Sequence, residues 1–149
     1  MSASDTMENG ILVLFLQNTA MANVGNAGGL QPSTVAGSLF VALHTADPTD
    51  SGSQVSSEAT YTGYGRQAVA RSSGGWTVSG TSPTQGTNAA AVTFGACTAG
   101  SNTITHASLG QNTSGAGTAW LIGALGSSLA VSSGITPSFA IGALVITLD

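Results

Sequence analysis

The chain has 149 residues, a net charge of −4 and a charged fraction of only 5%, whereas an average soluble domain is about 25% charged. Two cations, Arg66 and Arg71, cannot neutralise a row of phosphates or hold an anionic membrane, so we expect neither nucleic acid nor membrane as a partner. Gly, Ala, Ser and Thr make up more than half of the sequence, and only 5% is aromatic. The length indicates one domain, with a core built mainly from Val, Ile, Leu and Ala.

Residues 1–31 differ from the rest and are expected to form an N-terminal arm. Ser4 and Asp5 are good N-cap residues, and Glu8 follows Asp5 at the capping-box spacing, which predicts a short helix over Met7–Gln17. The run Ile11–Leu16 is wholly apolar, so a short buried strand is the alternative. The run is too short to cross a bilayer, which needs about 20 residues. It needs cover on every side, and we expect interface residues here: Ile11, Leu12, Leu14, Phe15 and Leu16.

From residue 32 onward the signals are those of short strands between Gly/Ser/Thr turns. Their spacing predicts an all-β domain over 32–149, as an antiparallel β-sandwich, jelly roll or barrel, of which we favour the sandwich, with the jelly roll as one form of it. Residues 46–60 are expected to form an exposed loop and residues 80–88 a turn region. The expected strands cover Leu39–His44, Tyr64–Arg71, Trp76–Ser79, Ala89–Cys97, Asn102–Leu109, Ala119–Leu125 and Ile135–Leu148.

The two histidines, His44 and His106, are candidates for a metal site or an acid–base pair. Neither has a metal-ligating neighbour at short spacing. Asp47 lies close to His44, but Asp47-Pro48 is typical of a turn. We therefore expect both histidines to be structural or interfacial, and a hydrolase that uses either of them with Asp47 is the alternative.

Other residues that could bind a cofactor or metal are also sparse. Asp47, Asp50 and Glu58 share one loop, but their spacing is too wide for a calcium loop, so a solvated loop is expected. The single cysteine, Cys97, excludes an intramolecular disulfide and is expected to be a buried strand residue. We therefore predict no catalytic residue, no cofactor and no metal, and a protein that is not an enzyme.

Both tryptophans and both arginines are candidate interface residues. Trp76 and Trp120 are expected in the core or at a subunit interface, and stacking on sugar rings is the alternative. Arg66 and Arg71 could pair with a carboxylate of a partner, with Glu58 or with the C-terminal carboxylate, because an Arg fork matches a carboxylate well.

Several segments together resemble a family of small tailed-phage virion proteins. Residues 39–50 are similar to the family's early "ALHTADP" segment, and four further segments and the ending follow in the family's order over residues 39–149. One departure lies in the arm: the N-terminal helix of similar sequences carries more charge, whereas the run Ile11–Leu16 is wholly apolar here. The matching segments are Leu39–Asp50, Tyr64–Val69, Asn88–Phe94, Thr105–Leu109, Ile122–Leu125 and Phe139–Asp149.

The resemblance implies a virion structural protein without an enzymatic site. The first hypothesis is a capsid cement or decoration protein that stabilises the shell, with the major capsid protein and copies of itself as partners. It would lie on the capsid surface of a virion assembled in the host cytoplasm. The alternative is a tail-fibre or baseplate component that contacts host surface glycans. A neutral surface suits permanent packing, because its contacts lose little on salt screening.

Overall fold

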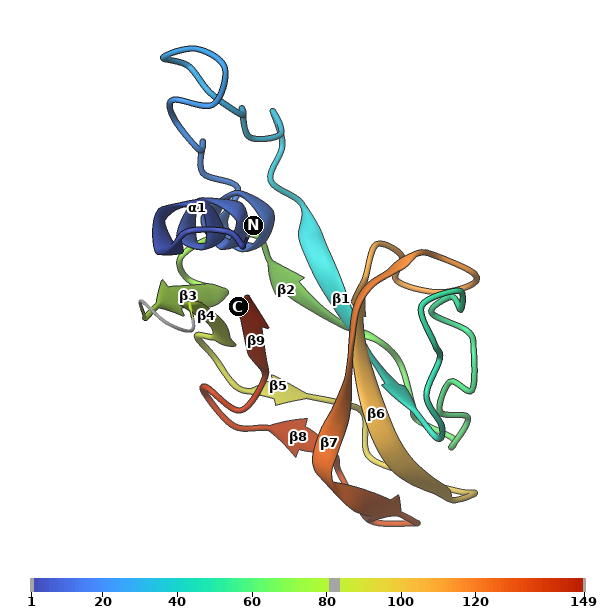
Figure 1. The fold of residues 1–149 in the computed structure, drawn as a ribbon. Helices are drawn as coiled ribbons and strands as arrows, with labels where there is room; N and C mark the ends of the chain where they lie inside the picture. Colours follow the sequence, from blue (N-terminus) through green and yellow to red (C-terminus); the bar gives the residue numbers. More distant parts are fainter. Residues whose placement is uncertain (1, 81–83, 149) are drawn as a thin grey trace. The chain divides into compact units, whose positions relative to one another are not determined.

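The computed structural model describes residues 2–80 and 84–148, which form one short helix and otherwise antiparallel strands (Figure 1). The predicted antiparallel β fold with an N-terminal helix is confirmed, and its sheets are not closed into a barrel. The strands are arranged in sheets of order β2-β1-β6-β7, β3-β4-β9 and β5-β8. The elements are α1 (Asp5–Gln17), β1 (Ser38–His44), β2 (Gln67–Ala70), β3 (Trp76–Ser79), β4 (Thr84–Asn88), β5 (Val92–Thr93), β6 (Asn102–Gly110), β7 (Ala119–Val131), β8 (Ser138–Phe139) and β9 (Val145–Leu148).

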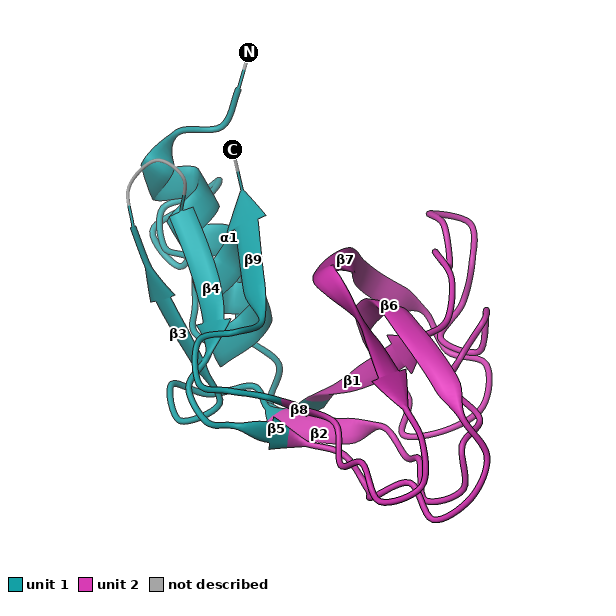
Figure 2. Cartoon of the chain, turned by 90° about the horizontal axis from the view of Figure 1, so that it is seen from below, with its two compact units in different colours: residues 1–38, 70–92, 139–149 teal, residues 39–69, 93–138 magenta. Residues whose placement is uncertain are grey.

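The chain folds into two compact units, each assembled from separate segments (Figure 2). Unit 1 combines residues 1–38, 70–92 and 139–149, and unit 2 combines residues 39–69 and 93–138. The N-terminal helix therefore shares a unit with the C-terminal strand. The predicted division of the chain into an arm (residues 1–31) and a β domain (residues 32–149) stays a prediction. The two compact units do not test it, because they are defined by contacts between segments that lie far apart in the sequence.

Unit 1 is a helix packed on the three-stranded sheet β3-β4-β9. Helix α1 contacts both β3 and β4. The alternate residues of β4, Thr84, Gly86 and Asn88, are buried, while the residues between them are partly exposed, as expected when a strand is covered on one face. Gly86 lies against the Leu16 side chain, in space that a Cβ would need. The absence of a side chain at Gly86 thus lets the helix approach the sheet.

The predicted N-terminal helix is confirmed, and its ends have clear local causes. Ser4 is the N-cap, and its hydroxyl accepts a hydrogen bond from the Met7 amide at 3.4 Å. Asn18 closes the helix in the left-handed conformation, at φ 55°. Gly10, which weakens a helix interior, contacts the Met21 side chain where a larger residue would clash. Helix α1 begins at Asp5, two residues earlier than predicted, because Ser4, the first of the two expected caps, is the one that is used.

Unit 2 is built on the four-stranded sheet, in which the middle strands β1 and β6 are antiparallel partners. Their register pairs Val41 with Leu109 and His44 with His106. A small aromatic group adds to this core: the Tyr61 and Tyr64 rings meet edge to face at 5.5 Å between centroids, and Tyr64 stacks with Phe94 at 6.1 Å. Cys97 is free and buried, as expected, but it lies between β5 and β6 rather than in a strand.

Several strand boundaries differ from those predicted. Residues 84–88 form β4, the middle strand of unit 1, where a turn region was expected; residues 81–83 of that region lie outside the described residues. The prediction was wrong because this polar segment is held by pairing with β3 and β9 on both sides rather than by its own propensity. β7 is longer than predicted, and Ala89–Cys97 and Ile135–Leu148 contain only short strands.

Candidate functional site

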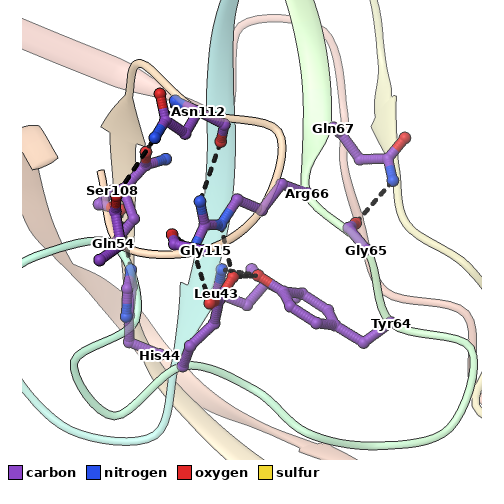
Figure 3. Close-up of polar contacts among 12 residues, drawn as sticks. Leu43, His44, Gln54, Tyr64, Gly65, Arg66, Gln67, Ser108, Asn112 and Gly115 are labelled. Carbon is purple, nitrogen blue, oxygen red and sulfur yellow. Dashed lines mark hydrogen bonds and ion pairs between the residues drawn. The ribbon is translucent and has the colours of Figure 1, made fainter. Parts of the chain in front are cut away.

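The most connected polar cluster of the structure lies in unit 2 around Arg66 (Figure 3). The Arg66 guanidinium donates to both carboxylate oxygens of Glu58, Nε to Oε1 at 2.6 Å and one terminal nitrogen to Oε2 at 2.7 Å. It also donates to the backbone carbonyls of Asn112 and Gly115, each at 2.9 Å. The Arg66 side chain is only 2% exposed. The hydrogen bonds to Glu58 are the main cause that raises the pKa of Arg66 further.

Tyr64 connects this ion pair to the central strand. Its hydroxyl donates to Glu58 Oε1 at 2.9 Å and accepts from the Leu43 amide at 3.0 Å (Figure 3). Burial is the main cause that raises the pKa of Tyr64 well above its ordinary value. Tyr64 is therefore held as a neutral phenol, which lets it donate to the carboxylate.

His44 forms a second polar link beside the first. Its ring is fully buried, with Nδ1 at 2.8 Å from the Ser56 carbonyl and Nε2 at 2.8 Å from Ser108 Oγ. A carbonyl only accepts, so Nδ1 carries the proton and Nε2 accepts from Ser108. Burial lowers the pKa of His44, since the charged ring would be poorly solvated.

The His44–Ser108 pair has the spacing of a base and a hydroxyl nucleophile, but its surroundings are those of a core contact. Ser108 is only 3% exposed, and Nδ1 of His44 donates to the Ser56 carbonyl rather than to a carboxylate. Asp47 instead accepts from the Thr49 amide at 2.9 Å, as in a turn. The geometry thus supports a structural link between the loop after β1 and strand β6.

Gln54 anchors the same loop to the segment between β6 and β7. Its side chain is fully buried, and Oε1 accepts from the Asn112 amide at 2.9 Å. Gly110 and Gly117 lie against Gln54, where a Cβ on either would collide with its side chain. The Gln54 backbone amide also donates to Gly117 at 2.9 Å. Together with Arg66, these contacts fix residues 45–58 and 111–118 to each other.

Arg71 plays a corresponding role in unit 1. Its guanidinium donates to the carbonyls of Leu14 at 2.8 Å and Phe15 at 2.7 Å, near the C-terminal end of α1, and to the Ala36 carbonyl at 3.2 Å. The positive charge lies at the negative end of the helix dipole, which stabilises it. A further contact joins it to Ser33 Oγ at 3.3 Å.

The predicted interface residues of the arm and the two tryptophans fall into exposed, intermediate and buried groups. Trp120 is 51% exposed and Ile11 is 38% exposed, so both can meet a partner as they stand. Trp76 is fully buried in the core of unit 1, so its ring offers no surface to a partner in this structure. Leu12 and Leu16 are also buried, whereas Leu14 and Phe15 are intermediate. Arg66 pairs with Glu58, one of the predicted partners, and the interface role of the exposed residues stays a prediction.

Within the described residues, no group of three or more His, Cys, Asp or Glu side chains could hold a metal ion. No helix among them is long and apolar enough to span a membrane. The sequence reasoning did not single out Tyr64, Gln54, Ser108 or Asn112. A signal was present only for Tyr64, which stands two residues before Arg66; the others are polar residues whose partners lie far away along the chain.

These observations define a class before any comparison: a small, weakly charged β protein whose polar side chains fix its own loops. A family model described as Podophage GP4 fiber I protein gp80 matches residues 2–147, and the chain belongs to this family. A search of curated proteins finds no match. The predicted membership in a phage virion protein family is thereby confirmed, and the protein is a virion structural protein of a fibre family. The similarity of residues 39–50 to the family's "ALHTADP" segment stays an interpretation.

Proposed function

We propose that this protein is a structural subunit of a fibre on a podophage virion. The family match over residues 2–147 is the observation that carries the proposal. The build of the molecule agrees with such a role. Both arginines and the buried histidine stabilise the chain's own loops and helix, which leaves a surface with little charge for packing against neighbours.

A capsid cement role is the second candidate, and the weakly charged surface is the observation that favours it. The chain carries only 5% charged residues, and such a surface packs against neighbours without strong dependence on salt. The two roles differ in location and number, since a cement protein covers the shell and a fibre subunit occupies a few attachment points.

Counting and locating the protein in purified virions tests both candidates. Gel densitometry against the major capsid protein gives the copy number, and gold-labelled antibody raised against this chain gives the position. The fibre proposal expects a low copy number and gold confined to fibres. Hundreds of copies with gold over the whole head would overturn it in favour of cement.

Contact with host surface glycans is a finer part of the fibre proposal. Trp120 is the tryptophan that could stack on a sugar ring, because it is 51% exposed whereas Trp76 is buried. Binding of the purified protein to a glycan array, compared with a Trp120→Ala variant, tests this part. Equal binding by the two proteins would argue against a role for Trp120.

A further inference from the structure

Strand β7 is the outer strand of the sheet in unit 2, and it is unusually long for that position. It covers 13 residues, pairs with β6 on one side, and pairs with no other strand among those described. Figure 1 shows β7 running alongside β6. The opposite outer strand, β2, has only four residues. The two edges of one sheet therefore differ in how much unpaired backbone they leave.

The β7 edge also lacks most of the features that protect an edge from pairing. Natural edges are blunted by charged residues, by proline, by short length or by bulges. β7 contains neither a charged residue nor proline, since its sequence is AWLIGALGSSLAV. Two irregularities interrupt its register with β6, and between them Leu121–Ala124 pairs regularly with residues 106–109. Exposed apolar side chains flank this run along the strand: Trp120 (51%) comes directly before it, and Leu129 (37%) follows the next irregularity.

We infer that the β7 edge pairs with β7 of a second copy of this chain in an antiparallel, two-fold arrangement. Charge is the argument for a second copy as the occupant. The chain carries −4 overall, yet none of its carboxylates lies on β7, so two copies can approach here without placing like charges opposite each other. A charged partner would find no complementary charge on this strand. Backbone hydrogen bonds would hold the strands, and a two-fold axis pairs the segment with itself.

Lysine substitutions at the edge test the inference on the purified full chain, independently of the fibre proposal. Ala124 and Ala130 are exposed on β7, and Ala68 is exposed on β2 at the other edge of the same sheet. We expect the wild-type protein to dimerise in sedimentation experiments. The A124K/A130K variant should raise the dimer dissociation constant by at least about tenfold, because both copies then carry positive charge along the edge that would pair. The A68K variant should dimerise like the wild type.

Cysteine cross-linking gives a second measurement that does not depend on destabilising the strand. The native Cys97 is only 1% exposed, so single cysteines introduced at residues 121–126 dominate disulfide formation. Antiparallel self-pairing expects cross-linked dimers at positions near the two-fold axis and fewer away from it. A wild-type chain that stays monomeric at its highest soluble concentration overturns the inference. So does a dimer that survives A124K/A130K with its melting temperature and cross-linking pattern unchanged.

Discussion

Replacement of Arg66 by methionine should destabilise unit 2 strongly, because it leaves a carboxylate without its counter-ion. Arg66 makes four hydrogen bonds, two to Glu58 and two to backbone carbonyls, and its side chain is 2% exposed. Removing one partner of a buried ion pair costs about 3–5 kcal/mol. The Glu58 side chain keeps 16% exposure, so water recovers part of this cost. We expect a loss of about 3 kcal/mol in the free energy of unfolding.

Two controls separate charge from hydrogen bonding in this prediction. Arg71→Met also removes four hydrogen bonds, but all to uncharged acceptors, so it should cost less, about 1–2 kcal/mol. The double variant Glu58→Gln/Arg66→Met removes the unpaired charge and should be more stable than Arg66→Met alone by about 1 kcal/mol.

Urea unfolding followed by circular dichroism and tryptophan fluorescence measures these differences. Thermal melting should agree, with a midpoint lowered by about 6–12 °C for Arg66→Met. A loss below about 1 kcal/mol for Arg66→Met, or a double variant no more stable than the single one, would refute the reasoning.

Three further predictions concern the other buried contacts. The pKa of His44 is lower in the folded chain than its ordinary 6.5. The contribution of His44 to the free energy of unfolding is therefore complete above pH 6.5 and decreases as the pH falls below this value. His44→Gln should remove this pH dependence from melting curves taken between about pH 5 and 7.5, whereas the control His106→Gln should keep it. Gly86→Ala should cost about 1–3 kcal/mol in urea unfolding because its Cβ collides with a leucine of α1, while Gly123→Ala, which meets no atom, should be nearly neutral. Asn88→Ala should cost about 2–4 kcal/mol in the same assay, since the buried amide donates to two carbonyls and accepts from one backbone amide; a neutral result would show that water replaces these bonds.

The sequence predicted those elements whose signals are local. Helix α1 follows from its cap at Ser4, and β1 and β6 follow from compact or alternating apolar residues. Strand β4 could not be predicted this way, because Thr84–Asn88 is polar and pairs with a strand at the far end of the chain. Its strand structure depends on partners rather than on propensity.

The candidate site shows the same limit. Pairing of Arg66 with Glu58 was one of the expected outcomes, because an Arg fork matches a carboxylate well and charged residues are rare in this chain. The link from His44 to Ser108 spans 64 residues and follows from the register of β1 with β6, which no local pattern contains. The two compact units were also not predicted, since each joins segments separated by a whole strand or more.

The internal use of both arginines has a consequence for how the protein responds to ionic strength. The Arg66 and Arg71 guanidinium groups are bound to acceptors of the chain itself. The exposed charges in the loops and at the start of the helix are all negative, and they belong to Asp5, Asp47 and Asp50. Copies therefore repel one another weakly at long range, and the proposed pairing of β7 acts only at contact. Added salt screens the repulsion and leaves apolar and backbone contacts almost unchanged. Association between copies should become tighter as salt is raised, the opposite of an assembly held by ion pairs.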